Sequence, residues 1–110
     1  MWRVAMAFAE SIYGVTKHFP REEQFGLTAQ LRRAAVAIPS NVSEEHQHGT
    51  KAYAHFVTMA LGSLAEAETQ LELARRLGLV SELQIASMTN TAATLGRLLH
   101  GLRKSLHGKT

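Results

Sequence analysis

The chain has 110 residues, of which 45% are hydrophobic and 19% are charged, which is typical of one small globular domain spanning residues 1–110. Twelve Lys and Arg against nine acids give a net charge of +3, and every acid is Glu because the sequence contains no Asp. Cys is absent as well. These absences exclude thiolate nucleophiles, thiolate zinc sites and Asp-containing catalytic triads.

The first residues do not resemble a targeting or membrane segment. Arg3 interrupts the apolar start of the chain and Glu10 follows it, so the long apolar core and small-residue cleavage site of a signal peptide are missing. No apolar run approaches the roughly 20 residues that a membrane-spanning helix needs. We therefore expect a cytoplasmic protein that has no membrane partner.

Apolar residues recur at helical spacing along the whole chain, and no stretch alternates as a strand would. The first predicted helix covers residues 3–18 and ends before Pro20, since the residue before a proline avoids the helical region. The second predicted helix begins after Pro20 and extends to residues 49–50, which end it and cap the next helix. Its apolar stripe stays in phase on both sides of Pro39, so we expect one helix that kinks near Pro39.

The third predicted helix, residues 51–77, has the strongest pattern, an apolar seam at alternating steps of four and three residues. Gly78 is expected to end this helix, and Ser81 is expected to cap a fourth helix that carries the same seam as far as Leu106. Four helices joined by short loops predict an all-α fold, an antiparallel up-and-down four-helix bundle. We expect the second, third and fourth helices to have matched lengths and the first to be shorter.

Polar residues occur on faces where a simple bundle would be apolar. Beyond Pro39 the second helix places polar residues in its apolar stripe, and the third helix has a second, mixed face. One interpretation is a hydrogen-bonded network that joins these helices, with Arg32 or Arg33 as the countercharge. The other is a subunit interface or ligand site on the same residues. The residues concerned are Gln30, Asn41, Glu44, Ser63, Glu66 and Gln70.

Two long blocks carry a resemblance to a known family. Residues 19–42, FPREEQFGLTAQLRRAAVAIPSNV, and residues 60–71, ALGSLAEAETQL, resemble the four helix bundle protein family, the 23S ribosomal RNA intervening-sequence proteins of bacteria. The resemblance implies an up-and-down bundle that assembles into a homopentameric ring and associates with nucleic acid. Residues 41–48 depart from the family pattern, because two glycines and an arginine are missing there, so we expect a stiffer connection between the second and third helices.

Three pairs of adjacent cations are candidates for contacting phosphates. They are Arg32 with Arg33, Arg75 with Arg76, and Arg103 with Lys104. The alternative for the last two pairs is that cations in the last turn of a helix complement its dipole. A ring would repeat each pair in every subunit and so strengthen a modest charge. Binding of RNA or DNA would then be directed to the backbone, with little sequence preference.

Metal binding and catalysis are both weakly indicated. Glu45 and His48 have the Glu-x-x-His spacing of di-iron bundles, with His46 and His55 nearby, but a second copy and two further inward Glu are missing. The sequence has no nucleophile elbow, phosphate loop or clear acid–base pair. We therefore expect no enzyme activity, no catalytic residues, no metal and no cofactor.

A third possibility is an assembly or adaptor protein that presents a surface to another protein. Val36 lies nearly opposite the stripe of the second helix, and Leu73 and Leu77 lie off the seam of the third. A monomer would expose these apolar side chains, whereas a homo-oligomer would cover them. The sequence thus predicts a homo-oligomeric, non-catalytic bundle that binds nucleic acid, with a protein-interaction scaffold as the alternative.

Overall fold

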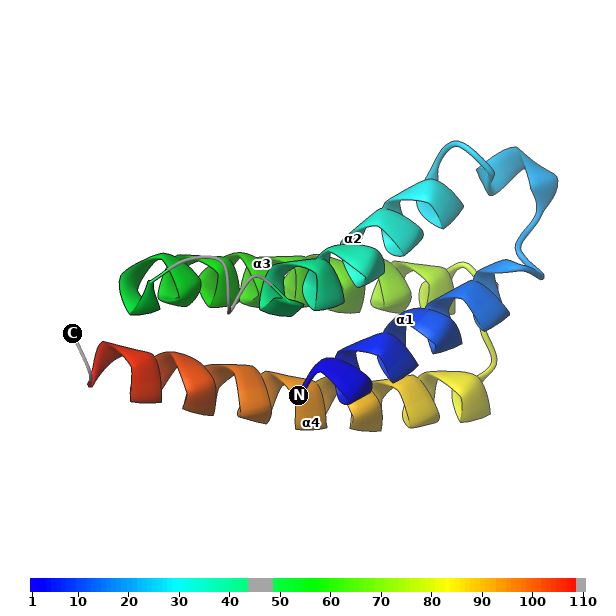
Figure 1. The fold of residues 1–110 in the computed structure, drawn as a ribbon. Coiled ribbons are helices and arrows are strands. Elements are labelled where there is room, and N and C mark those ends of the chain that lie inside the picture. Colours follow the sequence, from blue (N-terminus) through cyan, green and yellow to red (C-terminus); the bar gives the residue numbers. More distant parts are fainter. Residues whose placement is uncertain (44–48, 109–110) are drawn as a thin grey trace.

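A computed structural model describes residues 1–43 and 49–108. The described residues form four α-helices, one short 3₁₀ helix and no strand, which confirms the all-α fold. Figure 1 shows the long third and fourth helices side by side, with the two shorter helices beside them. The elements in chain order are α1 (Trp2–Thr16), η1 (Arg21–Glu23), α2 (Leu27–Val42), α3 (Thr50–Arg76) and α4 (Glu82–His107).

The core lies where the apolar seams of the four helices meet. The most extensive packing is between α2 and α3, followed by α3 with α4 and α1 with α2, and α1 also packs, less extensively, against α4. This pattern of neighbours is consistent with the predicted antiparallel bundle. The largest side chains that lose essentially all solvent contact are Phe8, Ile12, Leu31, Ile38, Val57, Leu95 and Leu99.

The second helix is shorter than the sequence pattern predicts. Residues directly after Pro20 form the separate turn η1, and α2 begins only at Leu27, after Gly26 with φ −105° and ψ −111°. A carboxylate oxygen of Glu23 accepts a hydrogen bond from the Leu27 N–H at 3.2 Å. The prediction of three matched rods is therefore wrong for the second helix: α2 has 16 residues, whereas α3 has 27 and α4 has 26.

Pro39 lies inside α2, as predicted from the unbroken apolar stripe. Ile38 and Val42 on either side of it are both buried, so the stripe keeps its phase through the proline. The kink at Pro39 stays a prediction. The expected helical continuation of the chain over residues 44–48 falls outside the described residues, and Gly49, not Thr50, occupies the N-cap position of α3.

Two local signals define the turn between α3 and α4. Gly78 has φ +75° and follows the C-cap Leu77, and the N–H groups of Gly78 and Leu79 donate to the carbonyls of Arg75 and Ala74. This is the Schellman arrangement, in which a left-handed glycine ends the helix. The Ser81 hydroxyl then accepts from the Gln84 N–H at 3.1 Å, and the Gln84 side chain accepts from the Ser81 N–H at 3.0 Å. Both predicted boundaries are confirmed.

Candidate nucleic-acid interface

The cations at the turn between α3 and α4 are paired with carboxylates. Arg75 donates to both carboxylate oxygens of Glu72, at 2.9 and 2.7 Å, and to Glu82 of α4 at 3.3 Å. Arg76 donates to Glu72 at 2.9 Å. We call this group of Glu72, Arg75, Arg76 and Glu82 the closed end of the α3–α4 pair. Its two positive and two negative charges cancel, which leaves little field to attract a phosphate.

The pairing at the closed end changes the titration of Glu72. Hydrogen bonds from Arg75 and then Arg76 lower the pKa of Glu72 to about 2. The same contacts raise the pKa of Arg75 above its ordinary value. Both side chains remain partly exposed, with 44% of Glu72 and 36% of Arg75 accessible, so solvent screens the pair and its effect on stability is modest.

The opposite end of the same two helices contains cations and no acid. Residues 49–58 at the start of α3 and residues 97–108 at the end of α4 contain no Glu. Among the described residues, no carboxylate forms an ion pair with Lys51, Arg97, Arg103 or Lys104 of this region. We call it the basic end. Its basic residues are Lys51, His55, Arg97, His100, Arg103, Lys104 and His107.

The heptad seam of α4 explains why Arg97 and Lys104 face outward. Leu95, Leu99 and Leu106 are buried on the core side of the helix, and Arg97 and Lys104 are out of phase with this seam, so they lie on another face. Arg97 and Lys104 are seven residues apart and therefore lie two turns apart on one face. Both are exposed. The packing of the apolar seam thus gathers the basic residues into a stripe.

Two hollows at the basic end give this stripe a concave surface. One, about 630 Å³, lies between α3 and α4 and includes Arg97, His100 and Arg103, with small residues such as Gly62 and Gly96 in its wall. The second, about 440 Å³, is lined by Lys51, Ala54, His55, Thr58 and His107. Thr58 borders both hollows, so they are neighbours on this surface, and Glu68 is the acid in the lining of the larger one.

Hydrogen bonds hold two of the basic side chains in place along α4. An Nη atom of Arg97 donates to the Thr94 hydroxyl at 3.3 Å. An Nη atom of Arg103 lies 3.2 Å from Nδ1 of His100. Each contact engages one nitrogen of a guanidinium that has five N–H donors. The remaining donors of both groups are therefore available for a phosphate.

The first predicted cation pair is divided between two different surfaces. Arg32 donates through Nε to the Thr16 hydroxyl at 2.8 Å, and its guanidinium lies 4.4 Å from the centre of the Tyr13 ring. It therefore faces α1. Arg33 is exposed and lines a hollow on the other side of α2, against α3. The structure does not bring either of them to the basic end.

Four of the predicted polar residues meet between α2 and α3. A hollow of about 300 Å³ is lined by Gln30, Ser63, Glu66 and Gln70, together with Arg33 and two alanines. The Gln70 amide donates to the Gln30 carbonyl oxygen at 3.4 Å, and the buried Oε1 of Gln70 has no hydrogen-bond partner among the described residues. Gln30 and Glu66 are exposed, so this hollow is open to solvent in the isolated chain.

The other two residues of that polar set are not part of this hollow. The Asn41 amide donates to the carbonyl of Ala37 in its own helix at 2.8 Å. Glu44 lies outside the described residues, as do Glu45, His46 and His48 of the di-iron-like spacing. Within residues 1–43 and 49–108, no three His, Cys, Asp or Glu side chains gather closely enough to hold a metal ion.

The search for adjacent cation pairs missed most of the basic end. Arg97 and His100 have no cationic neighbour in sequence, and Lys51 stands alone at the start of α3. The available signal was the absence of acids: after Glu82 the rest of the chain contains no Glu. Counting acids along each predicted helix would have pointed to this surface.

Together, the fold and this surface define a class of small helical-bundle proteins with one cationic end. The chain belongs to the 23S rRNA-intervening sequence protein family, whose sequence profile matches residues 1–101. This result confirms the resemblance carried by residues 19–42 and 60–71. A search of the curated proteins finds no match. None of the described helices is long and apolar enough to cross a membrane.

Proposed function

We propose that this protein is a non-catalytic, homo-oligomeric accessory protein that binds the backbone of RNA or DNA through its basic end. Family membership is compatible with a role alongside nucleic acid. The single observation that carries the proposal is the separation of charge along α3 and α4. Cations at the closed end are neutralised by Glu72 and Glu82, whereas Lys51, Arg97, Arg103 and Lys104 at the basic end have no carboxylate partner among the described residues.

Backbone contacts account for such a surface better than base readout does. Lys and Arg that neutralise phosphates release counterions and so give affinity without sequence preference. Phe, Tyr and Trp side chains, which would stack on the bases of a single strand, are absent from the linings of both hollows. We therefore expect the protein to bind duplexes of different sequence with similar affinity.

Self-association supports this function by repeating the basic end. A homopentameric ring would place five copies of the surface around one axis, which multiplies the attraction of a weakly charged subunit. The chain exposes large apolar side chains that an interface could cover. Phe25 is 90% exposed, Leu83 84%, Leu77 56% and Leu73 48%. We place the assembled protein in the cytoplasm, where ribosomal RNA is available.

Binding of a fluorescently labelled RNA duplex to two charge-matched variants tests the proposal. Arg103→Gln combined with Lys104→Gln should weaken binding by about tenfold at low salt and reduce the slope of log K against log salt by about 2. The control, Arg75→Gln with Arg76→Gln, removes the same charge from the closed end and should leave affinity within about twofold. Equal losses in the two variants would mean that net charge, not the basic end, governs binding.

The alternative function is a scaffold that binds another protein without nucleic acid, and the nearly complete exposure of Phe25 favours it. Light scattering with and without RNA, at low and high salt, separates the two functions. A nucleic-acid-binding oligomer gains mass when RNA is added at low salt and loses it at high salt. A scaffold keeps the same mass in all four samples.

A further inference from the structure

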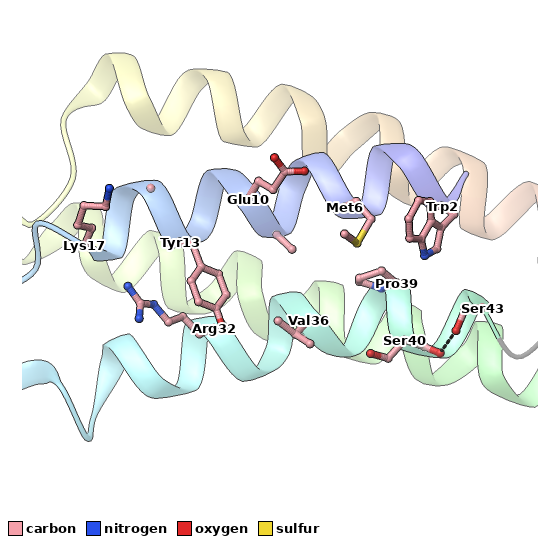
Figure 2. Close-up of a pocket in the computed structure, with 12 residues that line it drawn as sticks. Trp2, Met6, Glu10, Tyr13, Lys17, Arg32, Val36, Pro39, Ser40 and Ser43 are labelled. Atoms are coloured by element: carbon pink, nitrogen blue, oxygen red, sulfur yellow. Dashed lines mark hydrogen bonds between the residues drawn. The ribbon is translucent and has the colours of Figure 1, made fainter.

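A further hollow lies away from the basic end, between α1 and α2. It measures about 680 Å³, within the range of roughly 300–1,000 Å³ that small-molecule sites occupy. We call it the α1–α2 groove, and Figure 2 shows the side chains that line it. Most of its length is apolar, and these walls come from Trp2, Met6, Ala9 and Tyr13 of α1 with Val36 and Pro39 of α2.

Several large apolar side chains that line the groove are exposed to solvent. Trp2 is 50% exposed, Tyr13 44% and Val36 41%. In Figure 2 the side chains of Trp2, Met6 and Tyr13 extend from α1 toward α2. Large apolar side chains that face one another across a gap gain free energy when a ligand excludes water from it.

Two cations stand at one end of this groove. Arg32 is held there by its hydrogen bond to Thr16 and by the Tyr13 ring beneath its guanidinium. Lys17, at the end of α1, lines the same end. Among the described residues, no carboxylate pairs with either cation. The acid in the lining, Glu10, points away from α2 in Figure 2, so it does not neutralise the guanidinium.

We propose that the α1–α2 groove binds a small organic anion with an elongated apolar body. The carboxylate of such a ligand would accept hydrogen bonds from Arg32 and Lys17. The body would lie along Tyr13, Met6 and Val36 toward Trp2. Because the Thr16 contact and the Tyr13 stack already fix the guanidinium, little side-chain entropy is lost when the carboxylate binds. The site is independent of the nucleic-acid surface, with which it shares no residue.

Decanoate serves as the probe, and Trp2 reports its binding. Trp2 is the only tryptophan of the chain, so a saturable change in tryptophan fluorescence reports this groove. We expect decanoate to bind at least about tenfold more tightly than 1-decanol, because hydrogen bonds that involve charged groups are the stronger ones. Equal affinity for the alcohol and for decyltrimethylammonium would show that the cations have no role and would overturn the proposal.

Substitutions at the cationic end test the contacts. Arg32→Gln should weaken decanoate binding by about tenfold and leave 1-decanol binding unchanged. Lys17→Gln should have a smaller effect in the same direction, and among the described residues it breaks no ion pair. The matched control is Arg33→Gln, because Arg33 is the next residue but faces α3. The proposal fails if Arg33→Gln weakens binding as much as Arg32→Gln does.

A blocking substitution keeps the test decisive if Arg32→Gln perturbs folding. Gly14 lines the groove, and a Cβ added there meets no atom within 4 Å, so Gly14→Leu is chosen to add bulk to the wall of the groove. Gly101→Leu is the control, since Gly101 is also in a helix with nothing within 4 Å. We expect decanoate binding to be lost only in Gly14→Leu. If Gly14→Leu still binds decanoate, the ligand binds at another site. If self-association alone protects Trp2 from iodide quenching, a second copy of the chain covers the groove. Either result would overturn the proposal.

Discussion

The two ends of the α3–α4 pair both carry cations but have opposite electrostatic character. At the closed end, Glu72 stands three and four residues before Arg75 and Arg76, and Glu82 reaches Arg75 across the turn. At the basic end, Lys51, Arg97, Arg103 and Lys104 have no acid in the neighbouring residues of either helix. The comparison shows that adjacent cations in a sequence need not leave free positive charge, because carboxylates at helical spacing can neutralise them.

Reversing two charges at the basic end should have the largest effect of the substitutions that distinguish the two ends, and this effect is on RNA affinity. Arg97→Glu with Lys104→Glu places two carboxylates on the exposed face that the cationic stripe occupies. We expect affinity for an RNA duplex at low salt to fall by about a hundredfold, since two attractive contacts become repulsive. Fluorescence anisotropy measures the loss, and circular dichroism verifies that the helices remain formed.

Unchanged RNA binding by Arg97→Glu with Lys104→Glu would contradict the role of the basic end. If the reversed variant binds RNA with unchanged affinity, the phosphate contacts lie elsewhere, and Arg33 on the α2–α3 side is the next candidate. A variant with Arg33→Glu alone then becomes the informative measurement. Because Arg33 lines a different hollow, its effect is separable from that of the basic end.

A substitution in the turn at the closed end should have an intermediate effect, and this effect is on the free energy of unfolding. Gly78 has φ +75°, and an L-residue in the left-handed region costs about 1–2 kcal/mol. Gly78→Ala should lower the free energy of unfolding by that amount, as measured by urea denaturation. Gly101→Ala near the basic end is the control: the glycine is helical with open space around its Cβ position, so the substitution should stabilise by about 0.5–1 kcal/mol. A stabilising Gly78→Ala would contradict the role given to this turn.

Local signals explain which parts of the fold could be predicted from sequence. The left-handed Gly78 and the Ser81 cap act within a few residues, and the seams of α3 and α4 repeat over many turns, so each is readable along the chain. The start of α2 was mispredicted because the acids at 22–23 suit a helix N-terminus but here form the separate turn η1. Gly26 then delays the helix to Leu27.

The candidate sites depend on contacts that a single helix does not reveal. The spacing of Glu72 with Arg75 and Arg76 is visible in the sequence, but the bond from Arg75 to Glu82 requires the turn to bring α4 back beside α3. The α1–α2 groove depends on how two helices are aligned, because Arg32 reaches its partner Thr16 from 16 positions away. The periodicity of a sequence shows on which face of its own helix a residue lies. It does not show which face of another helix packs against that face.

The smallest effect is expected from Glu72→Gln, which tests why the closed end is neutral. The arginines lower the folded-state pKa of Glu72 to about 2 from an ordinary value of 4.5. A depressed carboxyl pKa contributes stability that is present above pH 4.5 and is lost as the pH falls toward 2. The natural protein should therefore have a slightly higher Tm than Glu72→Gln at neutral pH, and this difference should shrink between pH 4.5 and pH 2. A Tm difference that does not change with pH would contradict the ion pairing.

The same variant also changes the charge of the closed end. Without Glu72, Arg76 loses its carboxylate partner and Arg75 keeps only the exposed Glu82. If carboxylates alone keep this end from attracting phosphates, Glu72→Gln should raise affinity for an RNA duplex by about twofold to fivefold and increase the salt slope by about 1. Glu10→Gln on α1 adds the same charge away from these arginines and should change affinity less. Equal gains in the two variants would mean that net charge, and not the local pairing of cations, distinguishes the two ends.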